Sequence, residues 1–353
     1  MLLFDAHLDL SMNAMDWNRD LRLPAEAIRL AEHGMTDRRG RAGGTVTFPD
    51  MRRGEVGICV GTLIAPTARP QNPILGWNSP EQAWAQIHAQ YAWYEAMQAE
   101  GEIALITSAE QLDRAERCWA APDHDTPIGV VVSLEGADPI RQLGDLETLR
   151  ARGLRALGPA HYGPGRYANG TDATGGLPAC GRDLVKEMDR LGLILDATHL
   201  CDDCFWEALD LFEGPVWASH SNCRSLVPHN RQFSDDQFKA LFERDAVIGS
   251  VFDVWMMIPD WVRGKSKPLE AGVFIETIGN HIDHIAQLAG TAKHCGIGSD
   301  LDGGFGREQS PGDLDTIADL QTLRGILQKR GFSDDDIEGI FHRNFVGFLE
   351  RVL

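Results

Sequence analysis

The most informative pattern in this chain is a set of short apolar runs, each ending in a side chain that can bind a metal ion. These runs cover residues 2–9, 128–135, 193–199, 216–220 and 295–300, and they end in Asp9, Glu135, His199, His220 and Asp300. A His, Asp or Glu side chain is costly to bury without a partner, so packing alone does not explain such endings. Their recurrence along one chain predicts a single polar site where several strands end.

The spacing of apolar residues divides the chain into alternating strands and helices. Helix starts are predicted at 79–82, 310–313 and 333–336, where a serine precedes a proline or an aspartate, as at many N-caps. After Gly181, the apolar residues Leu184, Met188 and Leu191 can share one face of a further helix. Strands are predicted at residues 2–9, 55–65, 127–135, 153–160, 192–198, 215–220, 246–252 and 294–299.

Eight strands that alternate with helices predict a parallel sheet. Such a sheet is either closed into a barrel or open and doubly wound. No glycine-rich phosphate turn follows the first strand, which weakens the open, nucleotide-binding alternative. A (β/α)8 TIM barrel also accounts for the polar strand ends, because barrel active sites lie where strands end and loops begin. We therefore expect one domain over residues 1–353, with long loops at 158–179 and 252–268 over the C-terminal face.

Composition excludes several classes of partner. The 353 residues are 43% hydrophobic and 24% charged, which is typical of a soluble globular protein. A formal net charge of −19 argues against nucleic acid and anionic membranes, since both need a basic surface. The N-terminus lacks the features of a signal peptide, and no run reaches the roughly 18 apolar residues of a membrane span. We expect a cytoplasmic protein with no membrane or nucleic-acid partner.

The cysteines predict no disulfide framework, because their number is odd, at seven, and they are scattered through a large chain. Cys201 and Cys204 have the spacing of a zinc-binding pair, but no second cysteine pair lies nearby in the sequence. We interpret them as ordinary thiols at the start of a helix.

The strand ends offer the ligand types of a catalytic zinc site. His7 and Asp9 are two apart on a strand, so their side chains point to the same face and suit one ion. Glu135 has two carboxylate oxygens and can bridge two ions. His199 and His220 end consecutive strands and can hold a second ion. His, Asp and Glu are the ligands expected for Zn²⁺ in a site that keeps an open position.

Asp300 is a candidate proton carrier. A carboxylate beside two dications has a depressed pKa but can still accept a proton from a metal-activated water. Asp302 lies on the same face, and we interpret it as a residue that supports the site or fixes its loop. None of the six lysines ends a predicted strand, which argues against a carbamylated lysine bridge and leaves Glu135 for that role.

Several segments carry a resemblance to a known family. They are residues 5–9, 133–136, 153–161, 187–199, 219–221, 230–232, 281–285 and 296–300. In this combination the chain resembles the membrane dipeptidase (renal dipeptidase) family of metallopeptidases, in the amidohydrolase superfamily. The resemblance extends in order over nearly the whole chain.

The resemblance implies a dipeptidase with two Zn²⁺ ions per subunit, in which a bridging hydroxide attacks the peptide carbonyl. It implies that His7 and Asp9 bind the first zinc, that His199 and His220 bind the second, and that Glu135 bridges them. It further implies that His161 contacts the substrate and steadies the developing oxyanion. Arg231 matches the residue that binds a free C-terminal carboxylate, and Asp300 matches the acid/base.

Two features bear on specificity. Where family members often carry an Asn-Phe-Tyr-like run, this chain has Ser250-Val251-Phe252-Asp253, so that wall of the pocket is expected to differ. Bacterial members often accept a D-residue at the C-terminal position, which adds L,D-dipeptides to the expected substrates. The resemblance leaves a homodimer open.

Other functions stay open at this point. Another amidohydrolase reaction, by an amidase, lactonase or deaminase, shares the fold and the metals, because loops set the substrate. A metal-dependent barrel isomerase or lyase would usually add a lysine or a further acid at the strand ends. A non-catalytic binding protein would have lost some of the ligand residues, and here all of them are present.

Overall fold

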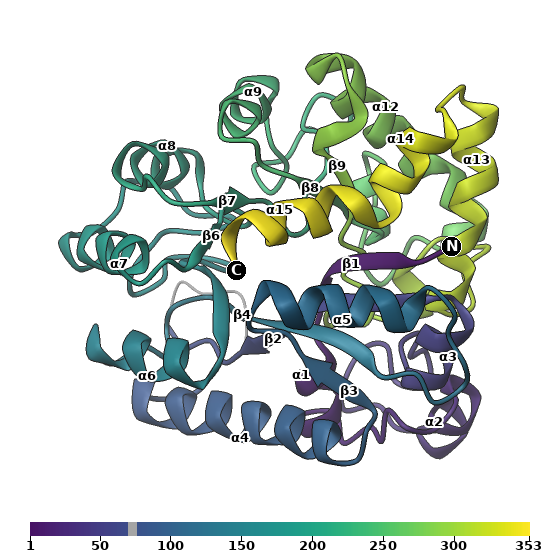
Figure 1. The fold of residues 1–353 in the computed structure, drawn as a ribbon, viewed down its shortest axis with the longest axis horizontal. Coiled ribbons are helices and arrows are strands. Elements are labelled where there is room, and N and C mark those ends of the chain that lie inside the picture. The colour runs from purple at the N-terminus through teal and green to yellow at the C-terminus, as the bar shows by residue number, and fades with distance from the viewer. Residues whose placement is uncertain (70–75) are drawn as a thin grey trace.

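The computed structural model describes residues 1–69 and 76–353, in which parallel strands form a (β/α)8 barrel surrounded by helices (Figure 1). The strands are β1 (Leu3–Leu8), β2 (Val56–Ile64), β3 (Ile103–Leu105), β4 (Ile128–Glu135), β5 (Leu154–Gly158), β6 (Ile194–Asp196), β7 (Val216–Trp217), β8 (Ile248–Ser250) and β9 (Cys295–Ile297). The α-helices are α1 (Leu10–Met15), α2 (Ala25–Ala31), α3 (Phe48–Arg53), α4 (Pro80–Ala99), α5 (Ala109–Trp119), α6 (Gly144–Arg152), α7 (Ala179–Arg190), α8 (Asp202–Leu211), α9 (Asp235–Glu243), α10 (Val254–Met257), α11 (Pro268–Ala271), α12 (Ile278–Ala289), α13 (Leu323–Lys329), α14 (Asp334–Glu338) and α15 (Asn344–Val352). Shorter helical segments are η1 (Ile275–Thr277), η2 (Ala292–His294), η3 (Arg307–Gln309), η4 (Ile317–Thr322) and η5 (Gly339–Arg343).

The strands lie in the order β7-β6-β5-β4-β2-β1-β9-β8, and all their pairings are parallel. A single bridge between Ala218 and Ile248 joins the two ends of this order. The strands are therefore arranged as a barrel, and their carboxyl ends meet at one rim. The short β3 pairs with the first half of β4 and stands outside the ring.

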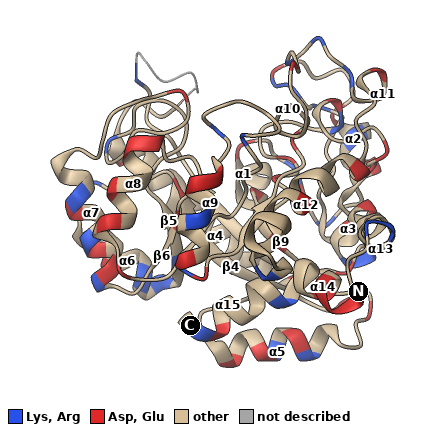
Figure 2. Ribbon diagram, turned by 90° about the horizontal axis from the view of Figure 1, so that it is seen from above, with Lys and Arg blue, Asp and Glu red and all other residues tan. Residues whose placement is uncertain are grey.

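Apolar side chains fill the interior of the barrel. Phe4, Val131 and Trp217, from three different strands, belong to one buried cluster with Phe345 of α15. The Phe345 ring stacks on Phe4 with centroids 5.2 Å apart. Gly296 leaves the space for this ring, since a β-carbon there would lie 2.4 Å from Cε2 of Phe345. Helix α15 crosses one end of the barrel beside α5, whereas α10 and α11 lie toward the opposite end (Figure 2).

All eight predicted strands are present, as are three of the four predicted helices. Ser79 caps α4 by accepting a hydrogen bond of 3.2 Å from the Gln82 amide, and Ser333 caps α14. The helix after Gly181 is α7. Cys201 is the N-cap of α8, which confirms the prediction that it lies at the start of a helix.

The helix predicted at 310–313 is wrong. Tertiary hydrogen bonds hold this segment in another conformation: the Gly312 amide donates to Val273, and the Asp313 carboxylate accepts from Ile275. Helical structure begins only after Thr316, which forms a capping box with Asp319. The predicted 252–268 loop is also partly helical, because it contains α10.

Within the described residues, no helix is both long and apolar enough to cross a membrane. The segment 159–178 is a long connection between β5 and α7, as expected. It reaches the same end of the barrel as the carboxyl ends of the strands, where the candidate site lies.

Candidate metal centre

The structure brings together the side chains that the sequence singled out as metal ligands. Three overlapping groups place their ligand atoms within 4.8 Å of one another: Glu135, His199 and His220; His7, Asp9 and Glu135; and His7, His220 and Asp300. Every ligand predicted from the strand ends therefore lies in one cluster at the carboxyl rim.

Glu135 is at the centre of this cluster. The alternation of β4 directs Val131 into the barrel, and Glu135 has the same parity. Its Oε1 lies 3.2 Å from Nε2 of His199 and 3.5 Å from Nε2 of His220. Its Oε2 lies 3.7 Å from Nε2 of His7. One oxygen of this carboxylate thus faces His199 and His220, and the other faces His7.

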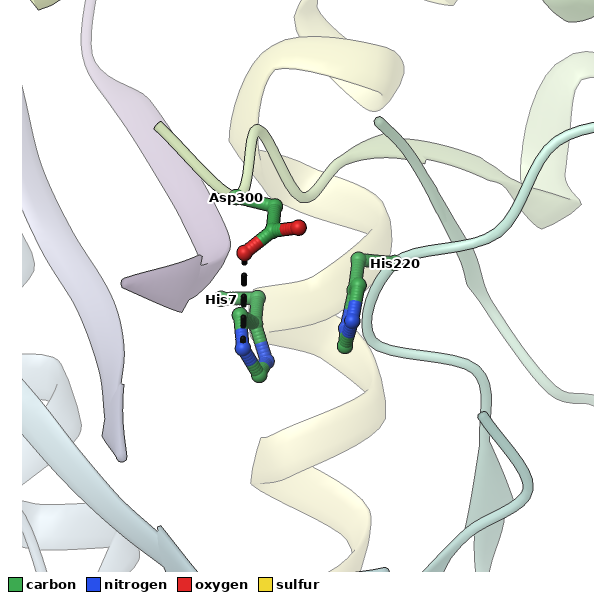
Figure 3. A group of neighbouring side chains, drawn as sticks. All are labelled: His7, His220 and Asp300. Carbon is green, nitrogen blue, oxygen red and sulfur yellow. Dashed lines mark ion pairs between the residues drawn. The ribbon is translucent and has the colours of Figure 1, made fainter. Parts of the chain in front are cut away.

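His7 also lies near two further carboxylates, those of Asp9 and Asp300. Nε2 of His7 lies 4.0 Å from Asp9 and 3.9 Å from Asp300. The rings of His7 and His220 have centroids 3.7 Å apart, and Asp300 faces them from one side (Figure 3). The Asp300 amide also donates to the carbonyl oxygen of His7 at 3.2 Å, which ties the end of β9 to β1.

The backbone and neighbouring hydroxyls orient the histidines. His199 follows β6 with φ of 68°, a left-handed conformation uncommon for a residue with a side chain. Nδ1 of His199 lies 2.9 Å from Oγ1 of Thr171, and Nδ1 of His220 lies 2.8 Å from Oγ of Ser219. These contacts leave each Nε2 to face Glu135, the arrangement in which a metal-binding histidine is usually fixed.

The charges of the cluster are unfavourable without a cation. Burial raises the pKa of Glu135 well above its usual range, and the carboxylates of Asp9 and Asp300 add to this. Burial likewise raises the pKa of Asp300, again with Asp9 nearby. Burial lowers the pKa of His199 well below its usual range, and the charge of Arg231 acts in the same direction. A divalent cation offsets these effects, because it favours ionised carboxylates and binds neutral imidazoles.

The residues present therefore fit a metal. Nε2 of His7 is buried and has no hydrogen-bond partner in the described part of the chain, although it faces three carboxylates. A buried polar atom of this kind normally has a partner. Histidine nitrogens and carboxylate oxygens are the donors that zinc accepts.

The cluster forms the floor of a cleft of about 1110 Å³, which also reaches His161 and Arg231. Nε2 of His161 lies 3.8 Å from Oε1 of Glu135, and its buried Nδ1 has no partner among the described residues. Arg231 is 3% exposed and donates to Oγ of Ser221 at 3.1 Å. Its Nε is buried without a partner in residues 1–69 and 76–353. Both sequence-predicted substrate residues thus border the cleft.

Two other acids near the rim hold backbone in place. Both carboxylate oxygens of Asp302 accept hydrogen bonds from the Thr45 amide, at 2.8 and 2.9 Å, as a loop-fixing residue would. Oδ1 of Asp5 accepts from the amides of His7 and Ser299 at 3.1 and 2.8 Å. Asp5 therefore joins β1 to the end of β9 below the cluster.

Sequence reasoning did not identify Thr62, Thr171, Tyr162 or Arg263 as part of the site. Thr62 donates to Asp9, and Tyr162 and Arg263 line the cleft. The sequence offered two weak indications that these residues belong to the site: Tyr162 is next to His161, and Thr62 is near the end of a predicted strand. Threonine and arginine in such places are too common to indicate a site by themselves.

The sequence of the whole chain matches a known family. The family model described as "Membrane dipeptidase (Peptidase family M19)" matches residues 1–352. An uncharacterized protein encoded in the pqqA 5′ region of Klebsiella pneumoniae is 28% identical over 261 residues, covering 71% of this chain and 90% of that protein. Dipeptidase aclJ of Aspergillus oryzae is 25% identical over 318 residues, covering 88% of this chain and 70% of that protein. The match to dipeptidase tcpJ of Claviceps purpurea, at 30% identity, covers 64% of this chain but only 52% of that protein.

Solved structures show the same fold. The crystal structure of a metallopeptidase of family M19, dipeptidase AC, has a TM-score of 0.79 and 25% identity, and the match covers 100% of this chain and 98% of that one. A metallopeptidase from Rhodobacter sphaeroides, liganded with a phosphinate mimic of the dipeptide L-Ala-D-Ala, also has a TM-score of 0.79, with 24% identity over 100% of this chain and 99% of that one.

Proposed function

Because the chain belongs to the membrane dipeptidase family (peptidase family M19), we propose that it is a binuclear zinc enzyme that hydrolyses dipeptides with a free C-terminal carboxylate. Membership in a family of metallopeptidases implies dependence on a metal.

The observation that carries the proposal is the position of Glu135, which lies between His7 on one side and His199 and His220 on the other. One oxygen faces His199 and His220, and the other faces His7. This is the arrangement needed for a carboxylate that bridges two ions. His7 and Asp9 would hold one zinc ion, and His199 and His220 the other.

Zinc ions bound there would supply a water molecule of lowered pKa and polarise the peptide carbonyl. Asp300 would accept the proton of the attacking water and deliver it to the nitrogen of the leaving amine. Its place supports this role, because it faces His7 and His220 and borders the cleft. His161 would donate a hydrogen bond to the carbonyl oxygen as negative charge develops there.

Arg231 would bind the C-terminal carboxylate of the substrate. The planar guanidinium matches a carboxylate with two parallel hydrogen bonds. Its Nη2 donates to the carbonyl oxygen of His220 at 2.9 Å and its Nη1 to Ser221, so the group is held in one orientation. Its Nε has no partner among the described residues, and Arg231 lines the cleft, so the guanidinium keeps donors for a ligand. This restricts the enzyme to short peptides whose carboxylate reaches Arg231.

The experiment that tests the function is a screen of L,L- and L,D-dipeptides with the zinc-loaded protein. L,D-dipeptides belong in the screen because the Rhodobacter sphaeroides protein, similar in fold, was liganded with a mimic of L-Ala-D-Ala. Hydrolysis that is lost on chelation and in His199→Asn, but kept in His33→Asn on the exposed surface, is the expected result. Absence of hydrolysis for every dipeptide would overturn the proposal in favour of another amidohydrolase reaction.

A further inference from the structure

Besides Arg231, the cleft is lined by Arg38, Arg39 and Arg263. We propose that Arg263 and Arg39 form a subsite for the side-chain carboxylate of an aspartate or glutamate at the C-terminal position of the substrate. The inference rests on the proposed dipeptidase function and names its substrate class.

Arg263 is close to the reacting centre. It follows β8 and lines the same cleft as Glu135 and Asp300. Tyr162 lines the cleft too, and its ring lies 5.2 Å from that of His199. A substrate held at the cluster would therefore present its side chains within reach of this wall.

The contacts of Arg263 hold it in place without using up its donors. Its guanidinium lies over the ring of Trp255 at 4.8 Å, and Nη2 lies 3.3 Å from Oδ2 of Asp253. The other oxygen of Asp253 accepts a hydrogen bond of 2.8 Å from Gln309. The guanidinium also interacts with the side chain of Tyr162, but it has five N–H donors in all. Arg263 is thus held in one orientation and still has N–H donors for a ligand.

Arg39 lines a small hollow beside the cleft together with Arg263. Arg39 and Arg263 both line this hollow, of about 70 Å³, and both also line the main cleft. A β-carbon at Gly264 would lie 3.7 Å from Cζ of Arg39, so Arg39 packs beside the backbone next to Arg263. A hollow of this size suits a carboxylate on one or two methylene groups.

Arg39 brings to this hollow a positive charge that is unpaired within the described residues. Arg39 lines the hollow and forms no ion pair with a carboxylate within 4.0 Å in the parts of the chain that the structure describes. Glu308 is the acid that lines the hollow, and its carboxylate accepts a hydrogen bond of 3.1 Å from the Gly306 amide. Since Arg263 pairs with Asp253, Arg39 is the guanidinium of the hollow that is left to pair with a ligand carboxylate. The loops near α10 carry several basic positions (Figure 2).

The order of the strands assigns this subsite to the C-terminal residue of the substrate. Arg231 follows β7, and Arg263 follows β8, which is the neighbour of β7 across the bridge from Ala218 to Ile248. If the backbone carboxylate of the substrate is at Arg231, the side chain of the same residue is the group nearest to the adjacent β8 loop.

The first test needs no variant. We expect kcat/KM of the zinc-loaded enzyme to be about tenfold higher for Ala-Asp and Ala-Glu than for Ala-Asn and Ala-Gln, the value for one charge-assisted hydrogen bond. The comparison is made with the C-terminal residue in the L and the D form. The preference should decrease when NaCl is raised from about 0.1 to 0.5 M, because salt screens exposed charges. Equal rates for the acid and its amide, or a preference only for an N-terminal acid, would overturn the inference.

Variants test the assignment to these arginines. Arg263→Met and Arg39→Met should each reduce the ratio of kcat/KM for Ala-Asp to that for Ala-Asn, mainly through KM. Arg22→Met is the matched control, since Arg22 is exposed, pairs with Asp20 at 2.9 Å and should keep the wild-type ratio. A general loss of structure would slow both substrates alike and leave the ratio unchanged, and an unchanged ratio in both variants would contradict the subsite.

Failure of this inference differs from failure of the proposed function. If Ala-Ala is hydrolysed but Ala-Asp has no advantage over Ala-Asn, the dipeptidase assignment stands and the subsite does not. If no dipeptide is hydrolysed, both fail.

Discussion

Nη2 of Arg231 donates a hydrogen bond of 2.9 Å to the backbone carbonyl oxygen of His220. The residue proposed to bind the substrate carboxylate is thus fixed to a residue proposed to bind zinc. Since both follow β7, the distance from the carboxylate-binding group to the metal centre is set by one short loop. This would restrict hydrolysis to the bond one residue from the carboxyl terminus.

Arg231→Met should mainly weaken substrate binding. Because the variant removes the charged partner of the carboxylate, we expect KM for dipeptides to rise by about tenfold or more. The wild-type enzyme should also discriminate against dipeptides with an amidated C-terminus, whereas the variant should not. Arg22→Met serves as the control, and an unchanged KM in Arg231→Met would refute the proposed role.

Asp300→Asn should remove the proton carrier but keep the metal centre. We expect kcat to fall by about 10²–10⁴-fold, as for the loss of a general acid or base. Zinc content, measured on the purified variant, should stay at the wild-type value. Asp125→Asn, on the exposed surface, should leave both quantities unchanged. Turnover at the wild-type rate in Asp300→Asn would exclude this aspartate as the acid/base.

Thr171→Val tests whether the hydroxyl next to His199 supports metal binding. The substitution keeps the size of the side chain but removes the partner of Nδ1, which lies 2.9 Å away. We expect the affinity for zinc to fall by about 10–100-fold. Thr148→Val, an exposed position on α6, is the matched control. The affinity is measured by competition with a chromogenic chelator, and equal affinities in both variants would show that Thr171 does not orient the ligand.

Phe345→Ala should destabilise the barrel from the end opposite the metal centre. The ring packs against Phe4 and Trp217 inside the barrel, so its removal leaves a cavity. We expect a loss of about 3–5 kcal/mol in the free energy of unfolding. Phe274→Ala should cost much less, because Phe274 is 39% exposed. Urea denaturation of the metal-loaded proteins measures both.

The eight barrel strands and the gathering of their polar ends could be predicted from the sequence. Apolar runs that end in Asp9, Glu135 or His220 place these groups at one rim once the strands are parallel. The short β3 was not predicted, because Ile103-Ala104-Leu105 is too brief to show a period. The segment 310–313 has the residues of a helix start, but hydrogen bonds to distant residues determine its conformation.

The contacts that orient the site could not be predicted. The left-handed backbone of His199 and the hydroxyl of Thr171 beside it depend on how the loop after β5 folds back over the barrel. Likewise, the pairing of Arg263 with Asp253 joins residues within a loop that shows no periodic pattern. Such contacts arise from tertiary packing, whereas the strand ends follow from local sequence.

The most direct test of the central claim is a titration of the metal-free protein with Zn²⁺, with dipeptide hydrolysis as the readout. We predict that activity rises until two equivalents of zinc per chain are bound, and that Glu135→Gln binds fewer than two and stays inactive. Full activity at one equivalent, or two tightly bound ions in Glu135→Gln with unchanged turnover, would contradict the account.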